Sequence, residues 1–199
     1  MMIKVCGITN AADAQAAIEG GATAIGFNFY EKSPRFIAPH AAADIVTSRV
    51  RRVGVFVNEQ PSVIELFAGI ARLDTIQLHG DEEVKDYPRN LVVWKAVRVN
   101  PDFSFTPYFR APAEALLLDG PAADLYGGSG RSFDWALAAG SGHRIIIAGG
   151  LDGSNVARAI EIAHPWGVDA CSRIESAPGI KDHTKMLDYL RAAKAALVS

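Results

Sequence analysis

Short apolar runs recur along the whole chain. Each contains four to six residues, is near-continuously apolar, and is separated from the next by glycine, proline or polar positions. This pattern is typical of strands that are buried on both faces of a parallel sheet. Eight runs are predicted as strands: Ile3–Cys6, Ala24–Phe29, Arg52–Val57, Thr75–Leu78, Val92–Val97, Ala115–Asp119, Arg144–Ala148 and Gly167–Ala170.

Helical patterns lie between most of these strands. Residues 10–21 begin with an asparagine cap, continue through an alanine-rich interior and end in two glycines, which is typical of a capped helix. The fifth connection, residues 100–112, has two internal prolines and three phenylalanines and predicts a short helix or an irregular turn. The other predicted helices span residues 39–50, 61–71, 152–163 and 181–197.

Eight strands that alternate with helices predict a single-domain (β/α)8 barrel, or TIM barrel, over residues 1–199. A doubly wound open sheet is the main alternative. Such sheets more usually have five or six strands and carry G-x-G-x-x-G in the first strand–helix turn. Here that turn reads CGITN, so the barrel is favoured.

Composition narrows the classes of partner. The chain is 49% hydrophobic and 21% charged, with a net charge of −2 and no Lys/Arg-rich run, which argues against nucleic acid or an anionic membrane as a partner. The apolar stretches are far too short to span a bilayer. Two cysteines and no apolar leader favour a reducing cytoplasm with free thiols. Both a monomer and a homodimer are physically reasonable.

Polar residues gather at the predicted carboxyl ends of the strands, which form the active-site face of a barrel. Asp119 follows three leucines. By itself it is more simply a cap, although a carboxyl group at the barrel mouth could act as a general acid. Cys6 by itself is more simply a packed thiol, although the N-terminus of the following helix would favour a thiolate that serves as a base.

Other strand-end residues suit a phosphorylated or carboxylated ligand. Gly149 and Gly150 would let main-chain N–H groups approach a phosphate, and Ser172 in the CSR sequence would supply the second half of that site. Arg35 is either a solvated surface residue or a residue that binds a carboxylate through two parallel hydrogen bonds. His79 is either structural or a ligand contact. No His, Cys and Glu cluster has metal-ligand spacing, so we expect no metal. The glycine-rich loop Gly127–Gly130 is expected to close over the site.

Together these motifs identify a family resemblance. The sequences that carry it, in order along the chain, are KVCGIT, GFNFYEKSPR, GVFVN, IQLHG, LLLDG, GGSGRSFDW, IAGGL and ESAPGIKD. They resemble the phosphoribosylanthranilate isomerase family of tryptophan biosynthesis over essentially the whole chain.

The resemblance implies a (β/α)8 enzyme that needs no cofactor. Its reaction is the Amadori rearrangement of N-(5-phosphoribosyl)anthranilate to 1-(2-carboxyphenylamino)-1-deoxyribulose 5-phosphate. Carried over by motif, Cys6 is the general base and Asp119 the general acid. Arg35 contacts the anthranilate carboxylate, and Gly149 and Gly150 contact the phosphate. The alternatives are another phosphosugar barrel, such as an epimerase or the related isomerase of histidine biosynthesis, and a non-catalytic phosphate-ligand-binding barrel.

The sequence departs from the family pattern at two places. The end of the eighth strand reads ACSRIE where VSSGVE is usual, so Cys171 and Arg173 replace a serine and a glycine. Asn28 replaces a usually aliphatic residue. We expect main-chain N–H groups near Ser172 and Arg173 to bind the phosphate, with the Arg173 side chain adding a charge-assisted contact. The alternative is that Arg173 extends into solvent or pairs with an acid such as Glu175.

Overall fold

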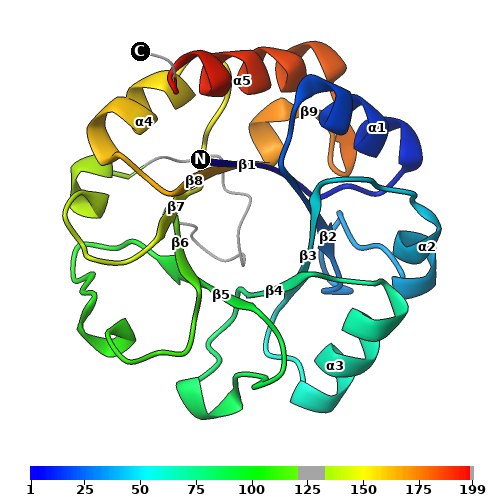
Figure 1. Cartoon of the computed structure of the whole chain (residues 1–199), viewed down its shortest axis with the longest axis horizontal. Coiled ribbons are helices and arrows are strands. Elements are labelled where there is room, and N and C mark those ends of the chain that lie inside the picture. The colour runs from blue at the N-terminus through cyan, green and yellow to red at the C-terminus, as the bar shows by residue number, and fades with distance from the viewer. Residues whose placement is uncertain (121–132, 198–199) are drawn as a thin grey trace.

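The computed structural model describes residues 1–120 and 133–197. Eight parallel strands pair in chain order and close into a barrel, with β1 against β8 (Figure 1). This confirms the predicted (β/α)8 fold, and every predicted strand end lies within one residue of the observed one. The strands are β1 (Met2–Cys6), β2 (Ala24–Asn28), β3 (Arg51–Phe56), β4 (Thr75–Leu78), β5 (Val93–Arg98), β6 (Ala115–Asp119), β7 (Ile145–Ile147) and β8 (Gly167–Ala170).

Helices surround the barrel unevenly. Alpha helices follow β1, β2, β3, β7 and β8, whereas the described parts of the connections after β4, β5 and β6 contain only short 3-10 helices. The fifth connection is therefore a short helix, as its prolines predict. The alpha helices are α1 (Ala11–Gly20), α2 (Pro39–Asp44), α3 (Pro61–Ile70), α4 (Val156–Ala163) and α5 (His183–Ala195). The 3-10 helices of those three connections are η1 (Val84–Asp86), η2 (Thr106–Tyr108) and η3 (Trp135–Ala138).

Two helix predictions were wrong at one end. The helix predicted over residues 39–50 ends at Asp44, because Ile45 is extended and two more β-branched residues follow it. The buried guanidinium of Arg52 donates hydrogen bonds to the carbonyls of Ala42 and Ile45, so a cation satisfies the carboxyl end of the short helix. The helix predicted from Asp152 begins at Val156, because Asp152 forms a turn with Ser154.

The interior of the barrel changes from apolar to polar along its axis. Alternate strand residues point inward, and those near the amino ends, including Trp94 and Leu117, form an apolar cluster. One layer further, Lys4 of β1 and Asp169 of β8 pair with 2.8 Å between Nζ and Oδ2. Cys6 and Asp119 end their strands beyond this layer. The fold thus places its polar residues at the carboxyl mouth.

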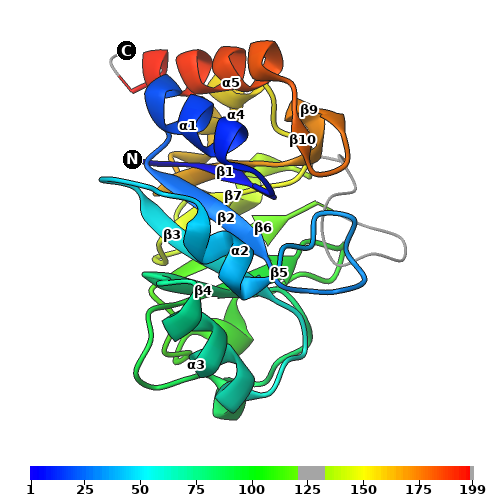
Figure 2. The ribbon, with the colours of Figure 1, turned by 90° about the vertical axis from the view of Figure 1, so that its right-hand side faces the viewer.

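A hairpin that the sequence did not predict follows β8. After η4 (Ser172–Ile174), the short strands β9 (Glu175–Ala177) and β10 (Ile180–Lys181) pair antiparallel. Thr9 donates a hydrogen bond to the Gly179 carbonyl, and the Lys181 N–H donates one to Asp13, so the hairpin is fixed against the start of α1. Figure 2 shows the hairpin on the same side of the barrel as the loop after β2. None of the described helices combines the length and the apolar character that a membrane span requires.

Candidate active site

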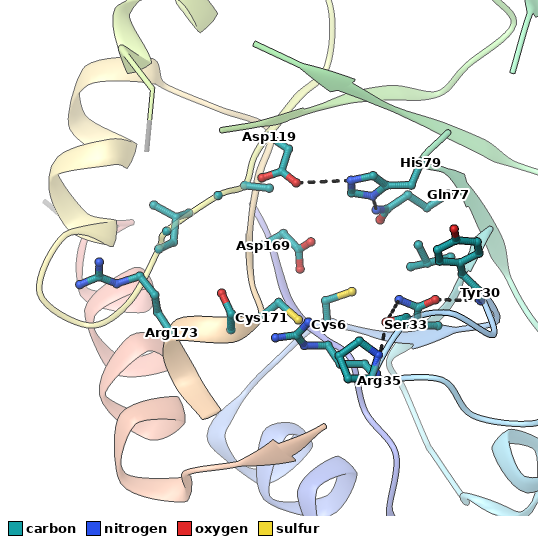
Figure 3. Close-up of a pocket in the computed structure, with 18 of the residues that line it drawn as sticks. Cys6, Tyr30, Ser33, Arg35, Gln77, His79, Asp119, Asp169, Cys171 and Arg173 are labelled. Carbon is teal, nitrogen blue, oxygen red and sulfur yellow. Dashed lines mark hydrogen bonds and ion pairs between the residues drawn. The ribbon is translucent and has the colours of Figure 1, made fainter. Parts of the chain in front are cut away.

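A cavity that is open to solvent lies at the carboxyl mouth of the barrel (Figure 3). Residues of β1, β2, β3, β4, β6 and β8 and of the loops after β2, β4, β7 and β8 form its wall. The residues predicted from the sequence that line it are Cys6, Arg35, His79, Asp119, Gly149, Gly150, Ser172 and Arg173.

Cys6 is held in an environment that favours its thiolate. The neighbouring Cys171 thiol is the largest cause that lowers the pKa of Cys6 well below its ordinary value, and the positive charges of Lys4 and Lys181 lower it further. Together they outweigh the burial of the thiol, which acts in the opposite direction. The sequence prediction named only the helix N-terminus as a stabilising group, and it did not include these cations.

Asp119 lies at the end of a hydrogen-bonded row. The Gln77 side-chain amide donates to Nδ1 of His79 over 2.8 Å, so Nδ1 is the acceptor and the ring proton lies on Nε2. That Nε2 is 3.3 Å from Oδ2 of Asp119. No described residue hydrogen-bonds the other carboxyl oxygen, Oδ1. The row fixes the orientation of Asp119 and leaves one oxygen for a ligand, and His79 contacts Asp119 besides lining the cavity.

Arg35 is part of a buried cluster of charges. Its Nε and Nη2 donate to the two carboxylate oxygens of Glu175 over 2.9 and 2.8 Å. Lys181 Nζ donates to the same carboxylate over 2.8 Å. Burial raises the pKa of Glu175, but these two cations lower it more, so the pKa falls below its ordinary value. Two cations therefore share one carboxylate, and no described residue bonds Nη1 of Arg35.

The loop after β2 is ordered by the departure at Asn28. The Asn28 amide donates to the Ser33 hydroxyl over 3.0 Å, and its carbonyl oxygen accepts the Tyr30 N–H over 2.9 Å. The Ser33 hydroxyl in turn accepts the Arg35 N–H over 3.2 Å. An aliphatic side chain at position 28 could make neither of the two Asn28 bonds, so in this chain Asn28 orients Ser33 and thereby helps to place Arg35.

The loop after β7 is built around Gly149 and Gly150, whose φ angles are 80° and 67°. A side chain would be strained at both positions, so glycine is required there. Nearby, Arg173 pairs with Asp152 and not with Glu175, with 2.6 Å between Nε and Oδ2. Hydrogen bonds from Ser154 and Arg173 hold the pKa of Asp152 below its ordinary value despite partial burial. Arg173 thus neutralises a carboxylate beside the glycines.

Several residues of the cavity and its surroundings were given no role by the sequence analysis. Burial raises the pKa of Asp169 to about 7 against the attraction of Lys4, and Oδ1 of Asp169 has no hydrogen-bond partner among the described residues. Lys4, Gln77 and Asp169 could have been found as polar residues at inward positions of buried strands. Glu175 and Lys181 offered no such signal, because the hairpin that carries them was not predicted.

The loop Gly127–Gly130, expected to close over the site, lies outside the described residues. The part of the chain that the structure describes contains no group of three or more His, Cys, Asp or Glu that could hold a metal ion.

Comparisons with known proteins agree with this geometry. Residues 3–192 match the family model for N-(5'phosphoribosyl)anthranilate (PRA) isomerase. A protein of Solibacter usitatus named N-(5'-phosphoribosyl)anthranilate isomerase is 69% identical over 197 residues, which cover 99% of both chains. The crystal structure of phosphoribosyl anthranilate isomerase from Thermotoga maritima is 36% identical, with a TM-score of 0.87 and coverage of 98% of this chain and 99% of that one.

A further solved structure contains a bound ligand. It is a phosphoribosyl anthranilate isomerase in complex with reduced 1-(o-carboxyphenylamino)-1-deoxyribulose 5-phosphate. That structure is 36% identical to this chain and has a TM-score of 0.84. The match covers 98% of this chain and 99% of the other. The fold and the match over nearly the full length lead to one conclusion: this chain belongs to the N-(5'-phosphoribosyl)anthranilate isomerase family.

Proposed function

We propose that this chain catalyses the Amadori rearrangement of N-(5'-phosphoribosyl)anthranilate to 1-(2-carboxyphenylamino)-1-deoxyribulose 5-phosphate, without a cofactor. The observation that carries the proposal is the pairing of a stabilised thiolate, Cys6, with a carboxyl group, Asp119, in one cavity of a chain of this family. Both cysteines are free thiols, which a reducing cytoplasm preserves, and we propose that compartment for the reaction.

The reaction needs one acid and one base. Asp119 protonates the oxygen of the furanose ring, and the ring opens to a Schiff base. The Cys6 thiolate then removes the proton from C2 of the sugar, and the resulting enolamine tautomerises to the ketone. Cys6 suits this role because its lowered pKa favours the thiolate, and a base must be free of its proton before it reacts. His79, held by Gln77, keeps the Asp119 carboxyl group in place.

The two charged ends of the substrate suit different walls of the cavity. We place the anthranilate carboxylate at Arg35, where Nη1 has no bond to the described residues and Lys181 adds a second positive charge nearby. We place the phosphate at Gly149 and Gly150 and at the main-chain N–H groups near Ser172, because glycine loops allow close approach of the backbone to an anion.

The proposal is tested by mixing the protein with freshly generated phosphoribosylanthranilate and following the loss of substrate fluorescence. We expect the fluorescence to disappear much faster than in a matched sample without enzyme, with the ribulose product formed in equal amount. A non-catalytic phosphate-binding barrel would leave the uncatalysed rate unchanged. Turnover of the histidine-pathway substrate in place of this one would favour the related isomerase.

The Arg173→Gly variant tests the phosphate end of the cavity. Removing Arg173 leaves the Asp152 carboxylate without its cation beside the proposed phosphate position, so we expect a KM about 3- to 10-fold higher with little change in kcat, because the phosphate is remote from the reacting carbons. The measurement is steady-state kinetics at low ionic strength.

The matched control is the double variant Arg173→Gly with Asp152→Asn, in which the uncompensated charge is gone. It should recover most of the lost affinity. An unchanged KM in Arg173→Gly at low ionic strength would contradict a role for this ion pair in phosphate binding, and so would a large fall in kcat.

A further inference from the structure

Asp169 is a charged side chain of the cavity that the proposed mechanism does not use. It lies on β8 at an inward position, one layer deeper in the barrel than Cys6 and Asp119, and we call this layer the floor of the cavity. The residue lines the cavity and is only 7% exposed. Figure 3 shows its carboxyl group between Cys6 and Asp119. Asp169 therefore lies close to the atoms that would react.

Lys4 holds Asp169 from inside the barrel. The Lys4 side chain is fully buried, and its Nζ donates to Oδ2 of Asp169 over 2.8 Å. Gly26 leaves room for this lysine, because a Cβ atom at position 26 would lie 3.0 Å from Lys4 Cε. Asp169 lines the cavity whereas Lys4 does not. The pair thus presents its carboxylate, and not its cation, to a ligand.

Two residues on the floor of the cavity each keep an oxygen without a hydrogen-bond partner among the described residues. These atoms are Oδ1 of Asp169 and Oε1 of Gln77, whose amide nitrogen donates to His79. Both residues line the cavity, and both are less than a tenth exposed. A buried acceptor without a donor costs stability, and a bound ligand can supply the missing donor. The floor therefore suits a ligand with hydrogen-bond donors at its centre.

The proposed substrate has its hydroxyl groups at its centre. Its carboxylate and phosphate ends offer acceptors, whereas the hydroxyl groups of the sugar between them are donors. In the proposed reaction Cys6 removes the proton from C2, so the C2 hydroxyl group lies near Cys6 as well. Asp169 is the carboxylate on the strand next to Cys6, one layer deeper.

We propose that Asp169 is a further substrate-binding residue, whose carboxylate accepts a hydrogen bond from the hydroxyl group on C2 of the sugar. The inference rests on the proposed function, because that function places C2 at Cys6. It has a consequence for the product. The C2 hydroxyl becomes a ketone, which has no proton to donate, so Asp169 binds the hydroxyl-bearing species more tightly than the product and favours product release.

Two ligands that differ only at C2 test this contact. One is the proposed ketone product, and the other is its reduced form, in which C2 carries a hydroxyl group. Calorimetric titration at about pH 8 keeps Asp169 ionised, since burial raises its pKa to about 7. We expect the unaltered chain to bind the tighter C2 epimer of the reduced form at least about tenfold more tightly than the ketone, because only a hydroxyl donates to a carboxylate.

Asp169→Asn should remove this preference. Lys4 keeps the amide oxygen turned toward its ammonium, so the amide N–H group faces the cavity and can donate to a hydroxyl or a ketone alike. We expect the two dissociation constants to come within about threefold of each other. The double variant Lys4→Met with Asp169→Asn should lose the preference too. It leaves neither charge of the pair buried alone, and it provides the test if the single variant does not fold.

Arg35→Ala is the matched control. It should weaken both ligands, because both carry the same carboxylate, and the preference for the hydroxyl should remain. Equal affinities in the unaltered chain, or a tenfold preference that persists in Asp169→Asn, would overturn the role of Asp169 and leave the proposed function intact. Loss of the preference in Arg35→Ala would also overturn it, because the ratio would not then report a contact at C2. If the unaltered chain neither binds these ligands nor turns over the substrate, the proposed function fails and this inference fails with it.

Discussion

Asp119→Asn and Cys6→Ala should each lower kcat by at least about 100-fold while the fold is retained, because each removes one partner of general acid–base catalysis. Asparagine keeps the size of Asp119, and its carbonyl oxygen can still accept the proton on His79 Nε2. An amide cannot give a proton to the sugar ring oxygen. Alanine at position 6 keeps a small side chain but leaves no base. Steady-state turnover, with circular dichroism to verify folding, measures both effects.

The control for the loss of a carboxylate is Asp44→Asn. Asp44 is exposed at the end of α2 and lies outside the cavity, so its kcat should stay within a factor of two of the unaltered chain. Near-normal turnover in Asp119→Asn or in Cys6→Ala would reject the role of that residue. A lower melting temperature in either variant would assign part of the loss to the fold.

The barrel was predictable because its strands carry a strong local signal. Strands such as Ala115–Asp119 are apolar on both faces, and the runs are bounded sharply by polar residues and glycine, so even their ends were close to correct. The β-branched residues from Ile45 to Thr47 were only a weak local signal for the end of α2. The contact that satisfies this end was not predictable, because it comes from Arg52, a buried cation of the next strand that donates to the carbonyls of Ala42 and Ile45. Tertiary contacts of this kind leave no trace in local periodicity.

The candidate site also contains residues that the sequence located and residues that it could not locate. The rule that barrel chemistry lies at the carboxyl ends of strands located Cys6, His79 and Asp119, since each follows an apolar run. The partners of these residues come from distant parts of the chain. Glu175 lies 140 residues after Arg35, and the hairpin that carries it has strands of only three and two residues. Strands this short are below what a hydrophobic pattern can resolve.

Arg35→Ala should weaken substrate binding, with kcat/KM reduced by about 30-fold, which corresponds to about 2 kcal/mol for a lost charge-assisted pair in a desolvated site. It should also lower the free energy of unfolding, because Glu175 loses one of its two cations. Lysine at position 35 should recover only part of kcat/KM, since an ammonium cannot reproduce the planar fork of the guanidinium. Kinetics and denaturant unfolding of both variants measure these effects.

Glu175→Gln is the matched variant, because it breaks the same ion pair from the other side and keeps Arg35. It leaves Arg35 and Lys181 both without a carboxylate, so we expect a loss of about 3 kcal/mol in the free energy of unfolding, more than for Arg35→Ala, but a smaller loss of kcat/KM. If Arg35 were only structural, kcat/KM would not fall further in Arg35→Ala than in Glu175→Gln.

The pH dependence of stability provides an independent check on this cluster. The pKa of Glu175 is lower in the folded chain than its ordinary value of 4.5, since the cations outweigh burial. A carboxyl group of this kind contributes stability above its unfolded pKa and loses that contribution as the pH falls through the folded value. The difference in unfolding free energy between the unaltered chain and Glu175→Gln should therefore be full at neutral pH and shrink progressively below pH 4.5. A difference that stayed constant from neutral to acidic pH would mean that the ionised carboxylate is not what stabilises the cluster.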